Sequence, residues 1–174
     1  MVGILNTRAA FATAASLLVF VALTTFARGV ETPDVKITEV VSAPLSGEKE
    51  WVELYNASDV AVDLTGWKLT DLTDPQGTPA EQDLLALSGA IEPGTYLVFE
   101  VGATKLNNSG DSVGLYSGET EVSRVTFGPV ASPYTPNARN PKEGMGASYF
   151  AEFGKWIVTN ATPASANTLP AWWQ

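Results

Sequence analysis

The chain contains no cysteine and no histidine among its 174 residues. Without cysteine it can form no disulfide, no thiolate metal site and no cysteine nucleophile. Without histidine it lacks the most frequent general base and zinc ligand, and a Ser-His-Asp triad is excluded. A core of this size can hold without disulfides, so the lack of cysteine is compatible with export. We therefore expect no enzymatic activity, no catalytic residue and no resident cofactor.

Basic residues are also few: the sequence has 10 Lys and Arg but 19 Asp and Glu. The net charge is therefore -9. Phosphate binding needs clustered Lys and Arg, and the sequence contains no such cluster, so we expect no nucleic-acid partner. The hydrophobic content of 45% is enough to build a folded core. The length fits one domain with a short appendage.

Residues 9–27 contain no charged residue, follow Arg8 and are most apolar over residues 17–23. A basic residue, an apolar run and then small residues are typical of a secretory signal peptide, here residues 1–29 with the mature chain starting near Val30. The run also approaches the thickness of a bilayer as a helix, so a retained membrane anchor and a filament-forming helix are alternatives. All three interpretations predict an exported protein, extracellular or at the cell surface.

After residue 34 the sequence consists of short runs with a period of two, with turn residues about every ten positions. Residues 35–40 and 50–55 alternate apolar and polar positions, which indicates strands with one buried face. Further strands are expected at 60–64, 67–72, 96–99, 112–116, 122–127, 148–150 and 155–158, with loops at 73–81 and 128–146. No long amphipathic helix pattern follows residue 30. The pattern predicts an all-β fold, an antiparallel sandwich of two sheets.

Several segments together resemble the lamin-tail domain, in its prokaryotic, exported type. They are VKITEV at residues 35–40, EWVELYNAS at 50–58, VDLTGWKL at 62–69, IEPGTYLV at 91–98, GDSVGLY at 110–116, Trp156, and TPASAN at 162–167. The resemblance covers nearly all of residues 35–167 and leaves 168–174 as a tail. It implies an immunoglobulin-like β-sandwich. The domain is an interaction module in nuclear lamins, and no coiled-coil rod accompanies it here, so a lamin-like filament role does not transfer.

The motif positions within this resemblance are interpreted as structural: Glu50, Trp51, Glu53, Asn56, Gly66, Trp67 and Trp156. Gly66 is expected to allow a tight turn or a positive φ before Trp67. Trp51 and Trp67 are expected in the core, the alternative being an exposed platform for carbohydrate. Trp172 and Trp173 lie in the tail and either pack back on the sandwich or stay exposed.

Three kinds of candidate site remain. Loop carboxylates suggest calcium binding by Asp71 and Asp74, with Asp59, Asp63 and Asp83 nearby, although the spacing does not match an EF-hand. A glycosidase-like carboxylate pair would have to come from Glu50, Glu53 and Glu100, and the strand position of Glu53 disfavours it. Sequons predict glycosylation at Asn56, Asn107 and Asn160.

The sequence therefore predicts an exported, non-catalytic binding or structural module that makes adhesive or protein contacts with a protein or cell-envelope component. Loops and exposed sheet faces are the expected contact surfaces. The alternatives are a surface-filament subunit that keeps its N-terminal helix, and an accessory module that holds carbohydrate or nucleic acid.

Overall fold

The computed structural model describes residues 33–72, 81–108, 110–127 and 143–173. These residues belong to one compact unit that spans residues 32–174. The expected N-terminal targeting helix, residues 1–29, lies outside the described residues. Within the described part, no helix is long and apolar enough to cross a membrane.

The described residues form strands and one short 3₁₀ helix. The strands are β1 (Val35–Ala43), β2 (Glu50–Asn56), β3 (Val62–Asp63), β4 (Trp67–Leu72), β5 (Glu81–Ala86), β6 (Ala90–Ile91), β7 (Tyr96–Gly102), β8 (Asp111–Ser117), β9 (Thr120–Phe127), β10 (Met145–Phe150) and β11 (Lys155–Asn160). The 3₁₀ helix η1 (Ala171–Trp173) lies in the C-terminal tail.

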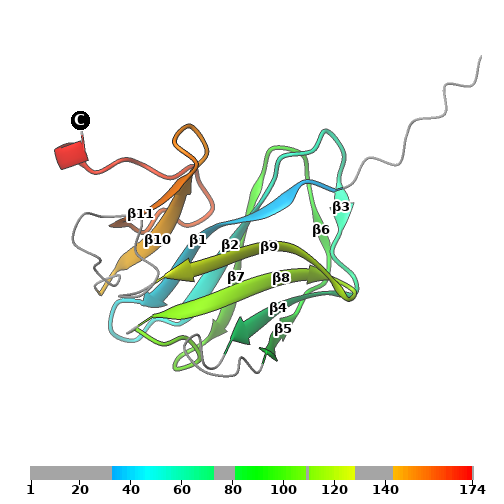
Figure 1. Cartoon of the computed structure of the whole chain (residues 1–174), viewed down its shortest axis with the longest axis horizontal. Coiled ribbons are helices and arrows are strands. Elements are labelled where there is room, and N and C mark those ends of the chain that lie inside the picture. The colour runs from blue at the N-terminus through cyan, green and yellow to red at the C-terminus, as the bar shows by residue number, and fades with distance from the viewer. Residues whose placement is uncertain (1–32, 73–80, 109, 128–142, 174) are drawn as a thin grey trace, which may run out of the picture. The chain divides into compact units, whose positions relative to one another are not determined.

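The strands form two main sheets and a small one. Sheet A has the order β11-β10-β1-β2-β7, and sheet C has the order β5-β4-β8-β9. Strands β3 and β6 form a two-stranded sheet of their own. Every strand pair is antiparallel. Figure 1 shows the strands of sheet C lying in front of β1, β2 and β7, with β10 and β11 to the left.

Apolar side chains from both sheets meet in one core, as expected for a sandwich. Sheet A contributes Val35, Ile37, Val40, Val52 and Leu54, and sheet C contributes Trp67, Leu69, Val113, Leu115, Val125 and Phe127. Leu64, which follows β3, and Ile91 of β6 belong to the same cluster. The all-β, antiparallel fold predicted from the alternating pattern is confirmed, and it is consistent with an immunoglobulin-like sandwich.

A bulge in β1 changes which residues face outward. Ile37 pairs with Leu54, whereas Glu39 pairs with Glu53, so one extra residue, Thr38, is inserted opposite β2. The insertion lets Ile37 and Val40 both face the core, although they are three positions apart. Thr38 and Glu39 are left on the outer face of sheet A. Strict alternation would have placed Glu39 in the core and Val40 outside it.

Two predicted element boundaries were wrong. Glu81, expected at the end of a loop, is the first residue of β5, and the strand expected at 60–64 contains only the two residues of β3. The hairpins 112–127 and 148–158 are confirmed as β8–β9 and β10–β11. In the tail, the ring of Trp173 lies 6.2 Å from that of Phe153, so this side chain packs back on the β10–β11 hairpin.

Candidate interaction surface

A row of side chains crosses the outer face of sheet A. Lys36 of β1 pairs with Tyr55 of β2, and Tyr55 pairs with Tyr96 of β7. The rings of Tyr55 and Tyr96 lie 4.5 Å apart between centroids, tilted by 32°. Such a cross-strand aromatic pair stabilises a sheet and presents a large, rigid surface.

This row forms the floor of a groove of about 460 Å³, which Tyr149 of β10 borders. We call it the tyrosine groove, lined by Lys36, Thr38, Tyr55, Ala57, Tyr96, Tyr149, Phe150, Ala151, Glu152, Ala166 and Asn167. Its volume and its mixture of aromatic and polar groups lie within the usual range for ligand sites. The side chain of Tyr149 shares the inner face of β10 with Ala147 and contacts Trp156 of β11, with 5.3 Å between ring centroids and a tilt of 47°.

The C-terminal residues 162–167, which we call the closing segment, supply one wall of this groove. The side-chain amide nitrogen of Asn167 donates hydrogen bonds to the carbonyl oxygens of Thr38 (3.0 Å) and Tyr149 (2.9 Å). These bonds tie the segment to β1 and to β10 at once. The shape of the groove therefore depends on the closing segment staying in place.

Beneath the closing segment lies Glu39, which is fully buried. Its Oε1 accepts a hydrogen bond from the Ser148 hydroxyl (2.7 Å), and its Oε2 accepts one from the Thr162 N–H (2.9 Å). Gly146 leaves room for this carboxylate, because a Cβ there would lie 2.6 Å from Glu39 Oε1. Burial raises the pKa of Glu39, while these hydrogen bonds act in the opposite direction.

Glu53, the neighbour of Glu39 across the β1–β2 ladder, is also fully buried. The Thr38 hydroxyl donates to its Oε1 (2.8 Å), and its Oε2 has no hydrogen-bond partner among the described residues. The pKa of Glu53 is raised to about 7, mainly by burial; the Thr38 hydrogen bond opposes this rise, the nearby Glu39 adds to it, and backbone hydrogen bonds from Ala164 and Ser165 of the closing segment oppose it. The closing segment therefore covers two carboxylates that differ in how well they are hydrogen bonded.

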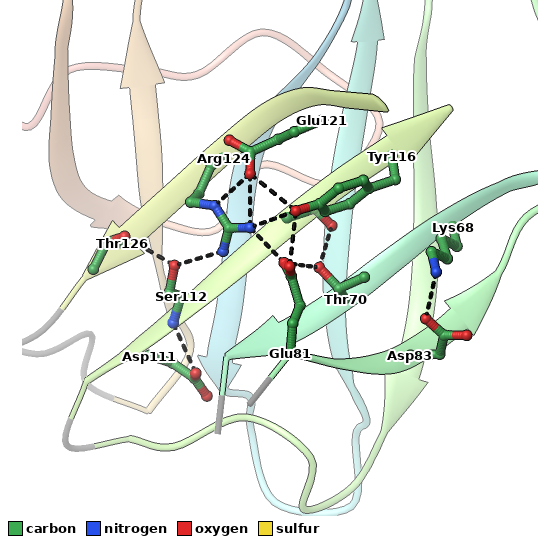
Figure 2. A network of polar contacts seen from close by, with 11 residues as sticks. Lys68, Thr70, Glu81, Asp83, Asp111, Ser112, Tyr116, Glu121, Arg124 and Thr126 are labelled. Atoms are coloured by element: carbon green, nitrogen blue, oxygen red, sulfur yellow. Dashed lines mark hydrogen bonds and ion pairs between the residues drawn. The ribbon is translucent and has the colours of Figure 1, made fainter. Parts of the chain in front are cut away.

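The outer face of sheet C carries a different, fully paired network, shown in Figure 2. Arg124 of β9 forms ion pairs with Glu81 and Glu121. The Tyr116 hydroxyl donates to Glu81 Oε2 (2.8 Å), and the Thr70 hydroxyl donates to Glu81 Oε1 (2.8 Å). Because these groups pair with one another across β5, β4, β8 and β9, the network links the four strands of sheet C.

A third set of polar side chains lies inside the sandwich, where β2 and β8 begin and β4 ends. Asp71 and Asp111 are both buried, and Glu50 is nearby. The N–H groups of Lys105 and Leu106 donate to Glu50 Oε2 (2.6 and 2.9 Å), so this carboxylate holds the loop after β7. The pKa of Asp71 is raised to about 7, first by burial, then by its hydrogen bond and charge interaction with Asp111, and then by the charge of Glu50.

The carboxylates expected to form sites do not come together. Asp63 caps its own turn through the Thr65 N–H (2.8 Å), Asp83 pairs with Lys68 (2.9 Å), Asp59 is exposed, and Asp74 lies outside the described residues. Glu53 is bonded by Thr38 on the outer face of sheet A, Glu50 holds the loop after β7, and the exposed Glu100 pairs with Lys49 (2.5 Å). In the described part of the chain, no three Asp, Glu, His or Cys side chains gather closely enough to hold a metal ion.

The sequons differ in accessibility. Asn56 is fully buried, and its amide nitrogen donates to the carbonyl oxygens of Val60 (2.8 Å) and Ile91 (2.9 Å), so the folded domain offers no acceptor there. Glycosylation of Asn56 stays a prediction, and its buried, hydrogen-bonded amide disfavours modification of the folded protein. Asn107 and Asn160 are exposed and stay predictions.

The motif tryptophans are mostly buried. Trp67 belongs to the core and Trp51 is 9% exposed, so neither offers a flat platform to a ligand. Gly66 has a φ of 81°, which fits the turn expected before Trp67. Trp156 is half-buried against Tyr149.

Sequence reasoning missed the tyrosine groove and the closing segment. Tyr55 and Tyr96 lie 41 positions apart, from 96 − 55, and only the β2–β7 pairing brings them together. The one available signal was the alternation within residues 50–55, which puts Tyr55 on the face opposite Val52 and Leu54.

Comparison with known proteins gives one match. A family model described as Lamin Tail Domain matches residues 30–129. No curated protein and no solved structure matches the chain.

Proposed function

The chain belongs to the Lamin Tail Domain family, whose members are immunoglobulin-like, non-enzymatic domains, and we propose that it is an exported binding module of the cell surface. Its partner in this proposal is a protein or another component of the cell envelope. The tyrosine groove is the contact surface. The observation that carries this choice is the row Lys36–Tyr55–Tyr96, bordered by Tyr149.

Tyrosine side chains suit such a surface for physical reasons. Each presents a broad apolar ring and a hydroxyl, and loses little conformational freedom on binding, so tyrosine is frequent at interaction hot spots. The rings of Tyr55 and Tyr96 are half-buried and in contact with each other, which holds them in place before a partner arrives. The outer face of sheet C is a poorer candidate, because Arg124, Glu81 and Glu121 already pair with one another.

The alternative of a carbohydrate platform built from exposed tryptophans finds no support in Trp51 and Trp67, which are buried. Export remains part of the proposal and has a simple test. N-terminal sequencing of the protein from the cell surface or medium is expected to start near Val30. A start near Ala9 would replace this proposal with the filament interpretation, since the apolar segment would then be retained.

The groove is tested by co-sedimentation of the purified exported chain with isolated cell envelopes of its host. We expect the double variant Tyr55→Ser/Tyr96→Ser to lose binding by about tenfold or more. The matched control is Leu45→Ser/Val60→Ser, which removes exposed apolar side chains outside the groove (54% and 39% exposed). Equal binding by both double variants would contradict the assignment of the groove.

A further inference from the structure

The closing segment forms one wall of the tyrosine groove and rests on two buried carboxyl groups. Thr162 donates to Glu39 Oε2 through its N–H (2.9 Å) and its hydroxyl (3.1 Å). Backbone hydrogen bonds from Ala164 and Ser165 lower the pKa of Glu53, which places these residues over its carboxyl. The segment itself carries no charged residue. Its position on the sheet therefore depends on the state of two acidic side chains of β1 and β2.

Two features make this cover easy to release. Ala164 has a φ of 58°, a left-handed conformation that is strained for a residue other than glycine and is relieved when the segment moves. Glu53 is fully buried, yet its Oε2 has no hydrogen-bond partner among the described residues. A buried, ionised oxygen without a donor is unfavourable. Movement of the segment would let water reach this oxygen.

The surroundings of Glu53 supply no cation to balance its charge. The titratable side chains on the outer faces of β1, β2 and β7 beside it are Lys36, Glu39, Tyr55, Tyr96 and Glu100. Lys36 pairs with Asp34 (3.0 Å), and Glu100 pairs with Lys49 (2.5 Å). Tyrosine ordinarily ionises near pH 10. Glu39 is thus the neighbour that matters near neutral pH, and its charge repels a second negative charge on Glu53.

We propose that the closing segment is a pH-dependent latch, which covers the two carboxyl groups in mild acid and is released as Glu53 loses its proton. The pKa of Glu53 is raised from 4.5 to about 7 while the segment covers it, so closure is fully favoured below pH 4.5 and progressively lost up to pH 7. Burial also raises the pKa of Glu39, which acts in the same direction.

Release of the latch would change the tyrosine groove. The segment takes with it Asn167, whose amide nitrogen bonds the carbonyl oxygens of Thr38 and Tyr149, so the groove loses one wall. Binding is then tighter in mild acid than in mild alkali. This effect on binding rests on the proposed function of the groove, whereas the release of the segment does not.

Hydrogen exchange of the full chain, followed for single amides by NMR at pH 5 and pH 8, tests the latch without a ligand. After division by the intrinsic exchange rate at each pH, opening at the Thr162 and Ser165 amides is expected to increase about tenfold or more from pH 5 to pH 8. In Glu53→Gln the increase is expected to fall below about threefold. The control Asp71→Asn removes another buried carboxyl with a raised pKa, outside the contacts of the segment, and is expected to keep the full increase.

The amides of β8 serve as an internal reference for unfolding of the whole domain. We expect the segment to be at least about tenfold less protected than β8 at pH 8, because it opens on its own. The proposal is overturned by a wild-type increase no larger than that of Glu53→Gln, or by equal protection of the segment and β8. The comparison with β8 uses the wild type alone and holds even where the variant does not fold.

Co-sedimentation with host cell envelopes at both pH values separates the latch from the function of the groove. Tighter binding at pH 5 than at pH 8 by the wild type, without this difference in Glu53→Gln, supports control of the groove by the latch. A segment that opens with pH in a chain that binds no envelopes supports the latch and contradicts the proposed function instead.

Discussion

Glu39 and Glu53 show how single residues determine the outer face of sheet A. Both are buried carboxylates with raised pKa values, and both lie under the closing segment. Glu39 has hydrogen-bond donors on both oxygens, whereas Glu53 has one oxygen without a partner. A neutral side chain would therefore be tolerated better at position 53 than at position 39.

The first prediction concerns Glu53→Gln. Because the pKa of Glu53 is raised from 4.5 to about 7, its protonated form stabilises the fold below pH 4.5, and this stabilisation is lost as the pH rises through 7. Glutamine is neutral at every pH, so the variant is expected to be more stable than the wild type at pH 8, by roughly 2 kcal/mol, and similar to it at pH 4.5. Urea denaturation at both pH values measures this, with the exposed Glu92→Gln as control; a variant less stable at pH 8 would refute the account of Glu53.

The second prediction compares two surface ion pairs. Arg124→Met removes a side chain that pairs with two carboxylates and is itself largely covered, so we expect a loss of about 1–2 kcal/mol. Lys49→Met removes a pair whose partners are both about 60% exposed, so we expect a loss below about 0.5 kcal/mol. Chemical denaturation measures both values, and equal losses would mean that the network adds nothing beyond a single pair.

At the scale of elements, the closing segment is held mainly by long-range contacts. Asn167 reaches back to Thr38, 129 positions earlier, and Thr162 reaches Glu39, 123 positions earlier. Ala164 within it has a φ of 58°, an uncommon conformation for a residue other than glycine. The segment has no strand partner of its own, so its position depends on these side-chain contacts.

The third prediction follows for Asn167→Ala. The variant loses two hydrogen bonds from one amide nitrogen, which we expect to lower the free energy of unfolding by about 2 kcal/mol. It is also expected to speed hydrogen exchange at residues 162–168 and to weaken envelope binding, because the groove loses a wall. Asn108→Ala, at an exposed position, serves as control. Normal exchange in the closing segment of Asn167→Ala would show that other contacts hold it.

These elements also show what the sequence could predict. The alternation in residues 50–55 and 112–116 determines β2 and β8, because each strand has one face in the core. The bulge at Thr38 has no such signal, since it arises from packing Ile37 and Val40 into one core. The tyrosine groove and the closing segment depend on contacts between distant residues, and alternation specifies only which face each residue occupies.

At the scale of the whole molecule, the proposed binding surface lies on sheet A, where the start of β1, the end of β2 and the start of β7 meet. Its outer face combines half-buried tyrosines with covered carboxylates, whereas the outer face of sheet C is an internally paired network. The family membership and the sandwich fold fit a scaffold that displays binding surfaces.

The fourth prediction is the pH dependence of overall stability. Glu53 and Asp71 both have pKa values raised to about 7, so their protonated forms favour the fold and the molecule loses stability between pH 5 and pH 8. Glu81 behaves in the opposite way: burial opposes its ionisation, but the hydrogen bonds from Arg124, Thr70 and Tyr116 lower its pKa, so its contribution is lost in stronger acid. We expect maximal stability near pH 5, measured by thermal melting from pH 3 to pH 9. A maximum at pH 8 would contradict this assignment of the buried carboxylates.

The central claim, that the outer face of sheet A is the binding surface, is tested most directly by hydrogen-exchange mass spectrometry of the exported chain, free and bound to its host's cell envelopes. We predict new protection in the peptides that contain Tyr55, Tyr96, Tyr149 and Asn167. Protection confined to β5, β4, β8 and β9, around Arg124, would contradict the claim and place the contact on sheet C.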